Sequence, residues 1–152
     1  MLQIRKFSKK DAKEVSRIIK ECYLKLKIGG HTKKGIKAQI DWNSPKNLVS
    51  RSKGIKYRVA VDNNKVVGIC GYDNKKVHTL FVDLKKHKKG IGKKLLSKIL
   101  NEARKEGLTT IRTWSTLYAE RFYNSFGFIT KKKLYLPEGA KDVILIEMEK
   151  RF

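Results

Sequence analysis

The stretch KKHKKGIGKKLL, residues 85–96, places six lysines and one histidine around Gly90 and Gly92. An apolar run with the character of a strand, Leu80-Phe81-Val82, precedes it, and apolar side chains at helical spacing follow it. Glycine lets a backbone approach a ligand closely, and the first amides of a helix have no intrahelical partner. Together with the helix dipole, this arrangement predicts an anion site where a strand passes into a helix.

Two common phosphate loops do not fit this stretch. The chain has no Gly-x-x-x-x-Gly-Lys-Ser/Thr pattern, and no third glycine follows Gly92 at the offset of a dinucleotide-binding fold. A Gly-x-Gly beside lysines is also compatible with a solvated charged loop. The elements on either side must therefore decide between the two interpretations.

Extended and helical patterns alternate along the whole chain, which predicts a single mixed α/β domain over residues 1–152 with a largely antiparallel first half. Strands are expected at residues 3–7, 57–61, 66–72, 76–82, 110–115, 128–136 and 142–150. Helices are expected from Asp11 to a stop at Gly29-Gly30, over residues 33–42, from Ser44-Pro45, from Gly92 to before Gly107, and over residues 119–126. Tight turns are expected at residues 62–65 and at Pro137-Glu138-Gly139.

The net charge of +23 favours contact with polyanions such as nucleic acid or nucleotides. However, 29 of the 37 basic residues are lysines and only 8 are arginines, and the lysines are spread from Lys6 to Lys150. Arginine is the usual residue for bidentate recognition of phosphate and of guanine. The excess positive charge can therefore reflect either a lysine-rich solvated surface or a nucleic-acid or ribosomal partner.

Other features exclude several classes of protein. No run approaches the roughly 20 apolar residues of a membrane span, so no membrane partner is expected. The N-terminal MLQIRKFSKK lacks the apolar stretch of a secretory signal, which favours a cytoplasmic location. Cys22 and Cys70 lack metal-ligand spacing and are expected to be reduced, buried residues, so no metal site is predicted.

Two motifs taken together resemble the GCN5-related N-acetyltransferase (GNAT) superfamily. The segment from Leu80-Phe81-Val82 through HKKGIG (residues 87–92) to Leu95-Leu96 is similar to its acetyl-CoA motif, Gln/Arg-x-x-Gly-x-Gly/Ala between a strand and a helix. About thirty residues on, FYNSFGF (residues 122–128) resembles the second hallmark, Phe-Tyr-x-x-x-Gly-Phe. The likeness extends over nearly the whole chain, but His87 stands where the family usually has Gln or Arg.

The resemblance implies a mixed, mostly antiparallel sheet of six to seven strands, with about four helices and a splay between the fourth strand (residues 76–82) and the fifth (residues 110–115). The pantetheine arm of acetyl-CoA would enter that gap and pair with the backbone near Phe81 and Val82, and the pyrophosphate would rest on the amides of residues 88–93. Ser115 would either contact the cofactor or substrate or cap its strand. The implied cofactor contacts are Phe81, Val82, His87, Lys88, Lys89, Gly90, Ile91, Gly92, Lys93 and Ser115.

The implied activity is acetyl transfer to a primary amine by direct attack, which requires a neutral amine and a proton for the departing thiolate. Tyr123 matches the tyrosine that serves many family members as general acid, although it also suits an aromatic core. His78 is a candidate base or water relay, or else a packing residue. Strand alternation would place His78 on the same face as Leu80 and Val82.

The candidate acceptor-binding residues are Tyr23, His31 and Trp42, each with an alternative as a packing or surface residue. The 14 acidic residues form no dense cluster, which disfavours polyamine and aminoglycoside acceptors. Peptide N-termini, lysines, small amines, amino acids and acceptors carried on RNA or ribosomes remain. A nucleic-acid- or ribosome-associated module, or a non-catalytic acyl-CoA sensor, would be compatible with the same fold, as monomer or homodimer.

Overall fold

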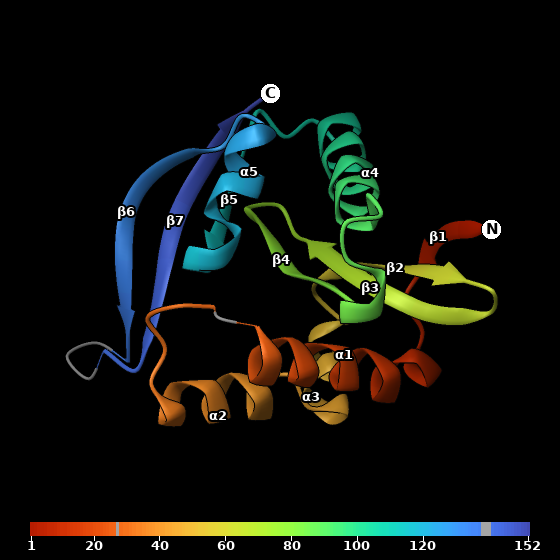
Figure 1. The fold of residues 1–152 in the computed structure, drawn as a ribbon. Helices are drawn as coiled ribbons and strands as arrows, with labels where there is room; N and C mark the ends of the chain where they lie inside the picture. Colours follow the sequence, from red (N-terminus) through yellow and green to blue (C-terminus); the bar gives the residue numbers. More distant parts are fainter. Residues whose placement is uncertain (27, 138–140) are drawn as a thin grey trace.

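The computed structural model describes residues 1–26, 28–137 and 141–152, and within them seven strands form one sheet in the order β1-β2-β3-β4-β5-β7-β6 (Figure 1). All neighbouring strands are antiparallel except β4 and β5, which are parallel. The strands are β1 (Leu2–Lys6), β2 (Lys56–Asp62), β3 (Lys65–Tyr72), β4 (Lys76–Val82), β5 (Thr110–Ser115), β6 (Ile129–Leu136) and β7 (Val143–Arg151). The mixed, mostly antiparallel sheet is confirmed. The predicted turn at Pro137-Glu138-Gly139 lies partly outside the described residues.

Five α-helices, one more than the resemblance implies, cover the two faces of the sheet in the described part of the chain (Figure 1). The helices are α1 (Ala12–Lys25), α2 (Lys33–Trp42), α3 (Pro45–Arg51), α4 (Ile91–Lys105) and α5 (Glu120–Ser125). The apolar side chains of α4 and α5 pack into one core, and those of α1 and α3 pack into a second core on the opposite face. No helix among the described residues is both long enough and apolar enough to span a membrane.

The first helix ends earlier than its sequence pattern predicts. It stops at Lys25, because Leu26 adopts an extended conformation (φ −90°, ψ 145°) and packs its side chain against the core of α1 and α3. The glycine pair Gly29-Gly30, both with positive φ, lies beyond the helix and turns the chain toward α2. The apolar side chain of Leu26 therefore continues the core but not the helix.

The sheet opens between its two parallel strands. Only two residue pairs join β4 and β5, namely Lys76 with Arg112 and Val77 with Thr113. Beyond Val77, β4 continues for five residues with no partner on this side. The splay implied by the resemblance is therefore confirmed, and main-chain groups on this side of β4 face a gap.

A β-bulge in β4 changes the side-chain alternation that the sequence pattern assumes. Thr79 has a positive φ of 56°, and the register with β3 shifts by one residue at this point. Leu80 and Val82 pack against the core of α4, whereas Phe81 packs against the core of α1. Because the bulge inserts one residue, His78 shares the α1 side of the sheet with Phe81. The prediction that His78 lies on the face of Leu80 and Val82 is wrong.

A close backbone contact holds α2 against the chain that precedes β7, and it yields a stability prediction. A Cβ atom on Gly35 would lie 1.9 Å from the carbonyl oxygen of Asp142, and Thr32 donates its amide to the same oxygen at 2.9 Å. Gly35→Ala should therefore lower the free energy of unfolding by about 1–3 kcal/mol, because the helix must move away from its support. Urea unfolding measures the effect, with Gly54→Ala as control, since a Cβ at Gly54 would meet no atom within 4 Å. Equal losses in both variants would contradict the prediction.

Candidate functional site

The gap between β4 and β5 leads into a cleft with a volume of about 1230 Å³. One part of its wall comes from the loop between β4 and α4 and from α5. The other part comes from α1, α2 and α3 together with the first residues of β4. The cleft therefore connects the two regions in which the sequence predicts a phosphate site and an acceptor site.

The predicted anion site lies at the start of α4. Gly90 is the N-cap residue in the left-handed conformation (φ 78°, ψ 10°), and no side chain caps the helix. The first main-chain bond of the helix runs from the Lys94 amide to the Gly90 carbonyl, so the amides of Ile91, Gly92 and Lys93 have no intrahelical acceptor. Gly90 and the three residues that follow it all line the cleft, so this end of the helix is open to it. The three amides and the helix dipole fit a diphosphate.

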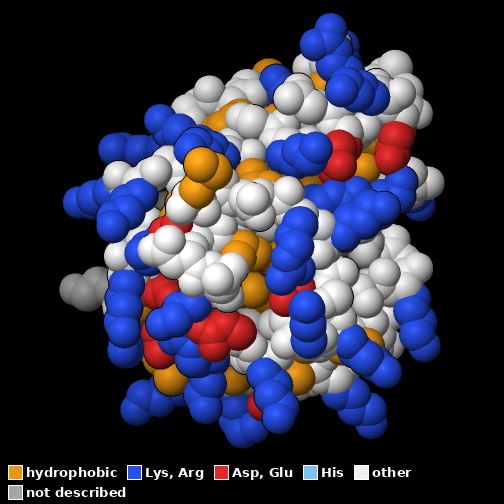
Figure 2. All heavy atoms as spheres, turned by 90° about the vertical axis from the view of Figure 1, so that its right-hand side faces the viewer, with side chains coloured by type: hydrophobic (Ala, Val, Ile, Leu, Met, Phe, Trp, Pro, Cys, Tyr) orange, Lys and Arg blue, Asp and Glu red, His pale blue; other side chains and the backbone are white. Residues whose placement is uncertain are grey.

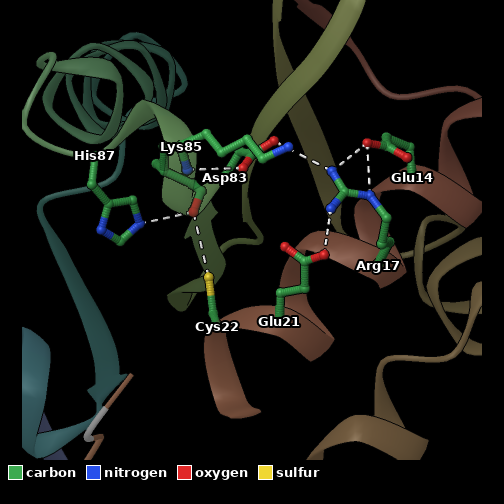
Figure 3. A network of polar contacts seen from close by, with 8 residues as sticks. Glu14, Arg17, Glu21, Cys22, Asp83, Lys85 and His87 are labelled. Atoms are coloured by element: carbon green, nitrogen blue, oxygen red, sulfur yellow. Dashed lines mark hydrogen bonds and ion pairs between the residues drawn. The ribbon is translucent and has the colours of Figure 1, made fainter. Parts of the chain in front are cut away.

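The N-terminal end of this loop is held to α1 by a charged network (Figure 3). The Asp83 carboxylate accepts the Lys85 amide at 3.1 Å and pairs with Nη2 of Arg17 at 3.3 Å. Arg17 also pairs with Glu14 and, at 2.8 Å, with Glu21 on its own helix. Asp83, which is not among the predicted site residues, thus fixes the position of the loop that leads to the predicted anion site.

The His87 side chain turns back onto β4 and not toward the anion site. Its Nε2 donates to the carbonyl oxygen of Val82 at 2.9 Å, and the Cys22 thiol donates to the same oxygen at 3.4 Å (Figure 3). The sequence resemblance leaves the role of this histidine open because the family usually has Gln or Arg there. In the structure, His87 fastens the loop to the strand.

The main chain of β4 faces the gap at Val82 but not at Phe81. The Asp83 amide donates to Val67 on β3 at 2.8 Å, and in an antiparallel pair such groups alternate along the strand. The polar main-chain groups of Phe81 consequently face β3, while those of Val82 face the gap. Of the two residues expected to pair with a pantetheine arm, only Val82 turns its main chain toward the gap, and Phe81 contributes its ring to the wall. Because the Val82 carbonyl oxygen already accepts from His87 and Cys22, its amide is the group left to pair.

Tyr123 on α5 lies in the wall of the cleft with only 5% of its surface exposed. Its ring packs edge-on against Phe122 and Phe128 at centroid distances of 5.5 and 5.4 Å. Burial raises the pKa of the Tyr123 hydroxyl well above its usual value of 10, and the buried Cys70 acts in the same direction. A hydrogen bond with Thr113 opposes this shift. The hydroxyl therefore retains its proton at neutral pH.

His78 lies half-buried in the wall of the cleft and contacts Asp73, which the sequence did not suggest. The two side chains are 2.9 Å apart, between His78 Nε2 and Asp73 Oδ2. Asp73 also accepts the amides of Lys75 and Lys76, both at 2.8 Å, which fixes its orientation in the turn between β3 and β4. Because a carboxylate only accepts, Nε2 carries the hydrogen and Nδ1 is the unprotonated nitrogen. Nδ1 has no hydrogen-bond partner among the described residues.

The remaining predicted residues divide into two groups. Tyr23, Trp42 and Ser115 line the cleft, as do all of residues 87–93 except Lys89. His31 does not line it: its ring lies beside that of Tyr23, 6.0 Å away, and its Nδ1 lies 3.2 Å from the carbonyl oxygen of Gly29. Ser115 donates its hydroxyl to the neighbouring Thr116 carbonyl at 2.7 Å, which suits a strand-end cap.

Two cations of the cleft wall, Arg51 and Lys76, were also missed by sequence reasoning. Arg51 ends the short helix α3, and Lys76 begins β4, so the chain separates them by 24 residues. Nothing in the local pattern distinguishes either from the other basic residues. Only the fold brings both near His78, where each lowers the pKa of the imidazole.

The basic side chains do not gather in one patch on the face shown in Figure 2. Lysine and arginine side chains are spread over the whole of this view, with carboxylates between them and apolar side chains near its centre. Such a distribution on this face is typical of a solvated surface.

Comparisons with known proteins agree with the fold. A family model described as an acetyltransferase (GNAT) domain matches residues 29–152. No curated protein shows significant sequence similarity to the chain. A GCN5-related N-acetyltransferase from Rhodopseudomonas palustris superposes with a TM-score of 0.90 at 15% identity, covering 99% of this chain and 95% of that chain.

Two further similar structures were solved with a nucleotide cofactor. PaiA N-acetyltransferase from Thermoplasma acidophilum, in complex with coenzyme A, has a TM-score of 0.81 at 22% identity and covers 100% of this chain and 99% of that chain. YncA from Salmonella typhimurium, a putative acetyltransferase solved with acetyl-CoA, has a TM-score of 0.70 at 20% identity. The match covers 99% of this chain and 94% of that chain. The family model accounts for most of the chain, and the protein belongs to the GNAT acetyltransferase family.

Proposed function

We propose that the protein is an acetyl-CoA-dependent N-acetyltransferase that acetylates a primary amine by direct attack. The observation that carries this proposal is the opening of the sheet after only two β4–β5 pairs, into a cleft that joins the unpaired amides of α4 to His78 and Tyr123. A module that only binds acetyl-CoA would need the cleft and the unpaired amides of α4, but neither His78 nor Tyr123. The convergence of a protonated hydroxyl and a neutral imidazole on the same cleft favours catalysis.

The cofactor assignment is supported by the fit of the cleft and by the two similar structures solved with coenzyme A or acetyl-CoA. In this chain the amides of Ile91, Gly92 and Lys93 would hold the diphosphate, and the main-chain amide of Val82 would donate to the pantetheine arm. When bound, acetyl-CoA supplies an acetyl group activated as a thioester.

The hydroxyl of Tyr123 is suited to the acid half of the reaction. It holds its proton at neutral pH because burial disfavours the phenolate. Amine acetylation releases a thiolate, and a proton donor in the wall of the cleft stabilises that leaving group. We assign this role to Tyr123.

The imidazole of His78 is suited to the base half of the reaction. Burial lowers its pKa below the usual 6.5, and the positive charges of Lys76 and Arg51 act in the same direction. Asp73 opposes the shift by hydrogen bonding. The ring is consequently neutral at pH 7, with Nδ1 able to accept a proton from the amine directly or through water.

The pH dependence of catalysis tests the assignment of His78. We expect kcat, measured at saturating acetyl-CoA and amine, to be flat near neutrality and to fall only below pH 6.5, as the imidazole becomes protonated. Asp73→Asn removes the interaction that raises the pKa of His78, so the acidic limb should move to lower pH. Profiles from about pH 5 to about pH 8 would show this shift. A limb that stays in place in Asp73→Asn and persists in His78→Gln would belong to another group.

Thiol release from acetyl-CoA tests the function as a whole. The release should depend on the presence of an amine, and mass spectrometry should show one acetyl group added to that amine. A screen of amines, amino acids and peptides, with acetyl-CoA affinity measured in parallel, separates the alternatives. Tight binding without turnover across the screen would indicate an acyl-CoA sensor and would contradict the proposed catalysis.

A further inference from the structure

We propose that the acceptor is a small amine that also carries an anionic group, a carboxylate or a phosphate, which Arg51 and Lys76 bind beside His78. This inference rests on the proposed function and names the class of acceptor. It starts from the charges in the wall of the cleft. Among the described residues that line the cleft there is no aspartate and no glutamate, whereas six lining residues are Lys or Arg.

Five of these cations fall into two regions, and the sixth, Arg121, lies on α5. Lys86, Lys88 and Lys93 belong to the loop before α4 and to its first turn, where a diphosphate accounts for them. Arg51 and Lys76 lie at the other part of the wall, and both act electrostatically on His78. The cofactor phosphates therefore do not explain this second pair of cations.

Arg51 is held rigidly and still has donors to offer. Its Nε donates to the Tyr57 hydroxyl at 3.2 Å, and its two terminal nitrogens donate to the Trp42 carbonyl and, at 2.7 Å, to the Asn43 side chain. These bonds use three of the five N–H groups of a guanidinium. Within the described residues, Arg51 makes no ion pair, whereas Arg5, Arg17, Arg58 and Arg112 all pair with carboxylates. A fixed guanidinium with free donors and no counter-ion is preorganised for an anion.

Lys76 provides the second positive charge. Its Nζ lies 3.4 Å from the centre of the Trp114 ring, and within the described residues no carboxylate lies within 4.0 Å of it. Asp73 and Glu147 are close enough to raise its pKa somewhat, against the larger effect of burial. The ammonium is thus stabilised by an aromatic face and retains capacity for an anionic ligand.

The same two cations select against other acceptors. A positive potential beside His78 disfavours the protonated form of an incoming amine, and thereby favours the neutral nucleophile. A polyamine would bring further positive charges into a cleft whose described lining residues include no carboxylate. An anionic group on the acceptor offsets both repulsions. The exposed rings of Trp42, Trp114 and Tyr118, which also line the cleft, can cover the apolar part of such a molecule.

Matched pairs of acceptors test the inference. Phenylalanine and phenethylamine differ by a carboxylate, and O-phosphoethanolamine and ethanolamine differ by a phosphate; spermidine represents the polyamines. At saturating acetyl-CoA, we expect kcat/KM for the anionic member of at least one pair to exceed that of its neutral partner by about tenfold or more, the effect of one charge-assisted hydrogen bond. The pair that shows the preference identifies the anion.

Variants of Lys76 connect the preference to the structure. Lys76→Met keeps the apolar stem over Trp114 and should reduce the ratio between anionic and neutral acceptors, and Lys76→Arg should restore it. The affinity for acetyl-CoA, measured by calorimetry, should be the same in the wild-type protein and in both Lys76 variants. Lys133→Met removes an exposed lysine of β6 outside the cleft and serves as the control.

The possible failures are distinguishable. Preference for the neutral amine or for spermidine would overturn the inference, as would a ratio that Lys76→Met leaves unchanged. The inference also fails if the protein acetylates other amines but no anionic member of the pairs. If acetyl-CoA does not bind, or if no amine of the wider screen is acetylated, the proposed function itself fails.

Discussion

Gly92→Asp is expected to weaken acetyl-CoA binding by at least about 100-fold while leaving the fold slightly more stable than before. A carboxylate at this position would face the diphosphate, and the loss of two charge-assisted amide bonds corresponds to about 100-fold or more in Kd. Gly92 lies in the first turn of α4, its φ is not positive, and a Cβ there would meet Phe122 and Val82 at ordinary distances of 3.6–3.7 Å. An acidic residue in the first turn of a helix is itself favourable by about 0.3–1 kcal/mol. The effects on stability and on binding should therefore have opposite signs.

Calorimetric titration and thermal unfolding of the same preparation measure these two effects. Gly54→Asp makes the same substitution at an open position outside the cleft and should leave the affinity unchanged. Gly92→Ala separates the contribution of the added atom from that of the charge. Gly90 is less suitable for this test, since its positive φ would strain any other residue. Undiminished affinity in Gly92→Asp would show that the diphosphate does not bind at the start of α4.

Tyr123→Phe is expected to lower kcat by about 100-fold, the lower end of the range for a lost general acid. The substitution keeps the ring that packs between Phe122 and Phe128 and removes only the hydroxyl, so the affinity for acetyl-CoA should change little. Because burial raises the pKa of Tyr123 above 10, the wild-type rate should not decline on the alkaline side through about pH 9. Single-turnover kinetics measures the chemical step separately from product release.

Tyr72→Phe is a suitable control for this experiment. Tyr72 is also buried, with its hydroxyl 2.8 Å from Glu106, but it does not line the cleft. Loss of the Tyr72 hydroxyl should lower the free energy of unfolding and leave kcat unchanged. Equal turnover by wild-type protein and Tyr123→Phe would reduce Tyr123 to a packing residue.

The parts of the site that depend on a short continuous segment could be predicted from the sequence. The open helix start at Gly90 and Gly92 follows from a strand, a glycine pair and a periodic helix within some twenty residues. The packing of Tyr123 follows from the aromatic residues that surround it in the chain, Phe122 on α5 and Phe128 just after the helix. The splay between β4 and β5 is different, because no periodicity encodes it, and it was expected only through the family resemblance.

The parts that depend on an irregularity or on distant elements could not be predicted. The extra residue at Thr79 reverses the alternation of side chains along β4. Strict alternation therefore predicts the α4 side of the sheet for His78, whereas the residue lies on the α1 side. The contact between His78 and Asp73 arises because the turn amides orient the carboxylate toward the strand that follows. Arg51 reaches the cleft only through the packing of α3, which a sequence pattern does not specify.

The two-pair junction between β4 and β5 also bears on how long the protein survives in a cell. A ligand that bridges the open edges completes a layer that the polypeptide alone leaves unfinished, and by mass action it stabilises the native state by about 2.7 kcal/mol when its concentration is 100 times Kd. Resistance to proteolysis would then rise and fall with the supply of acetyl-CoA.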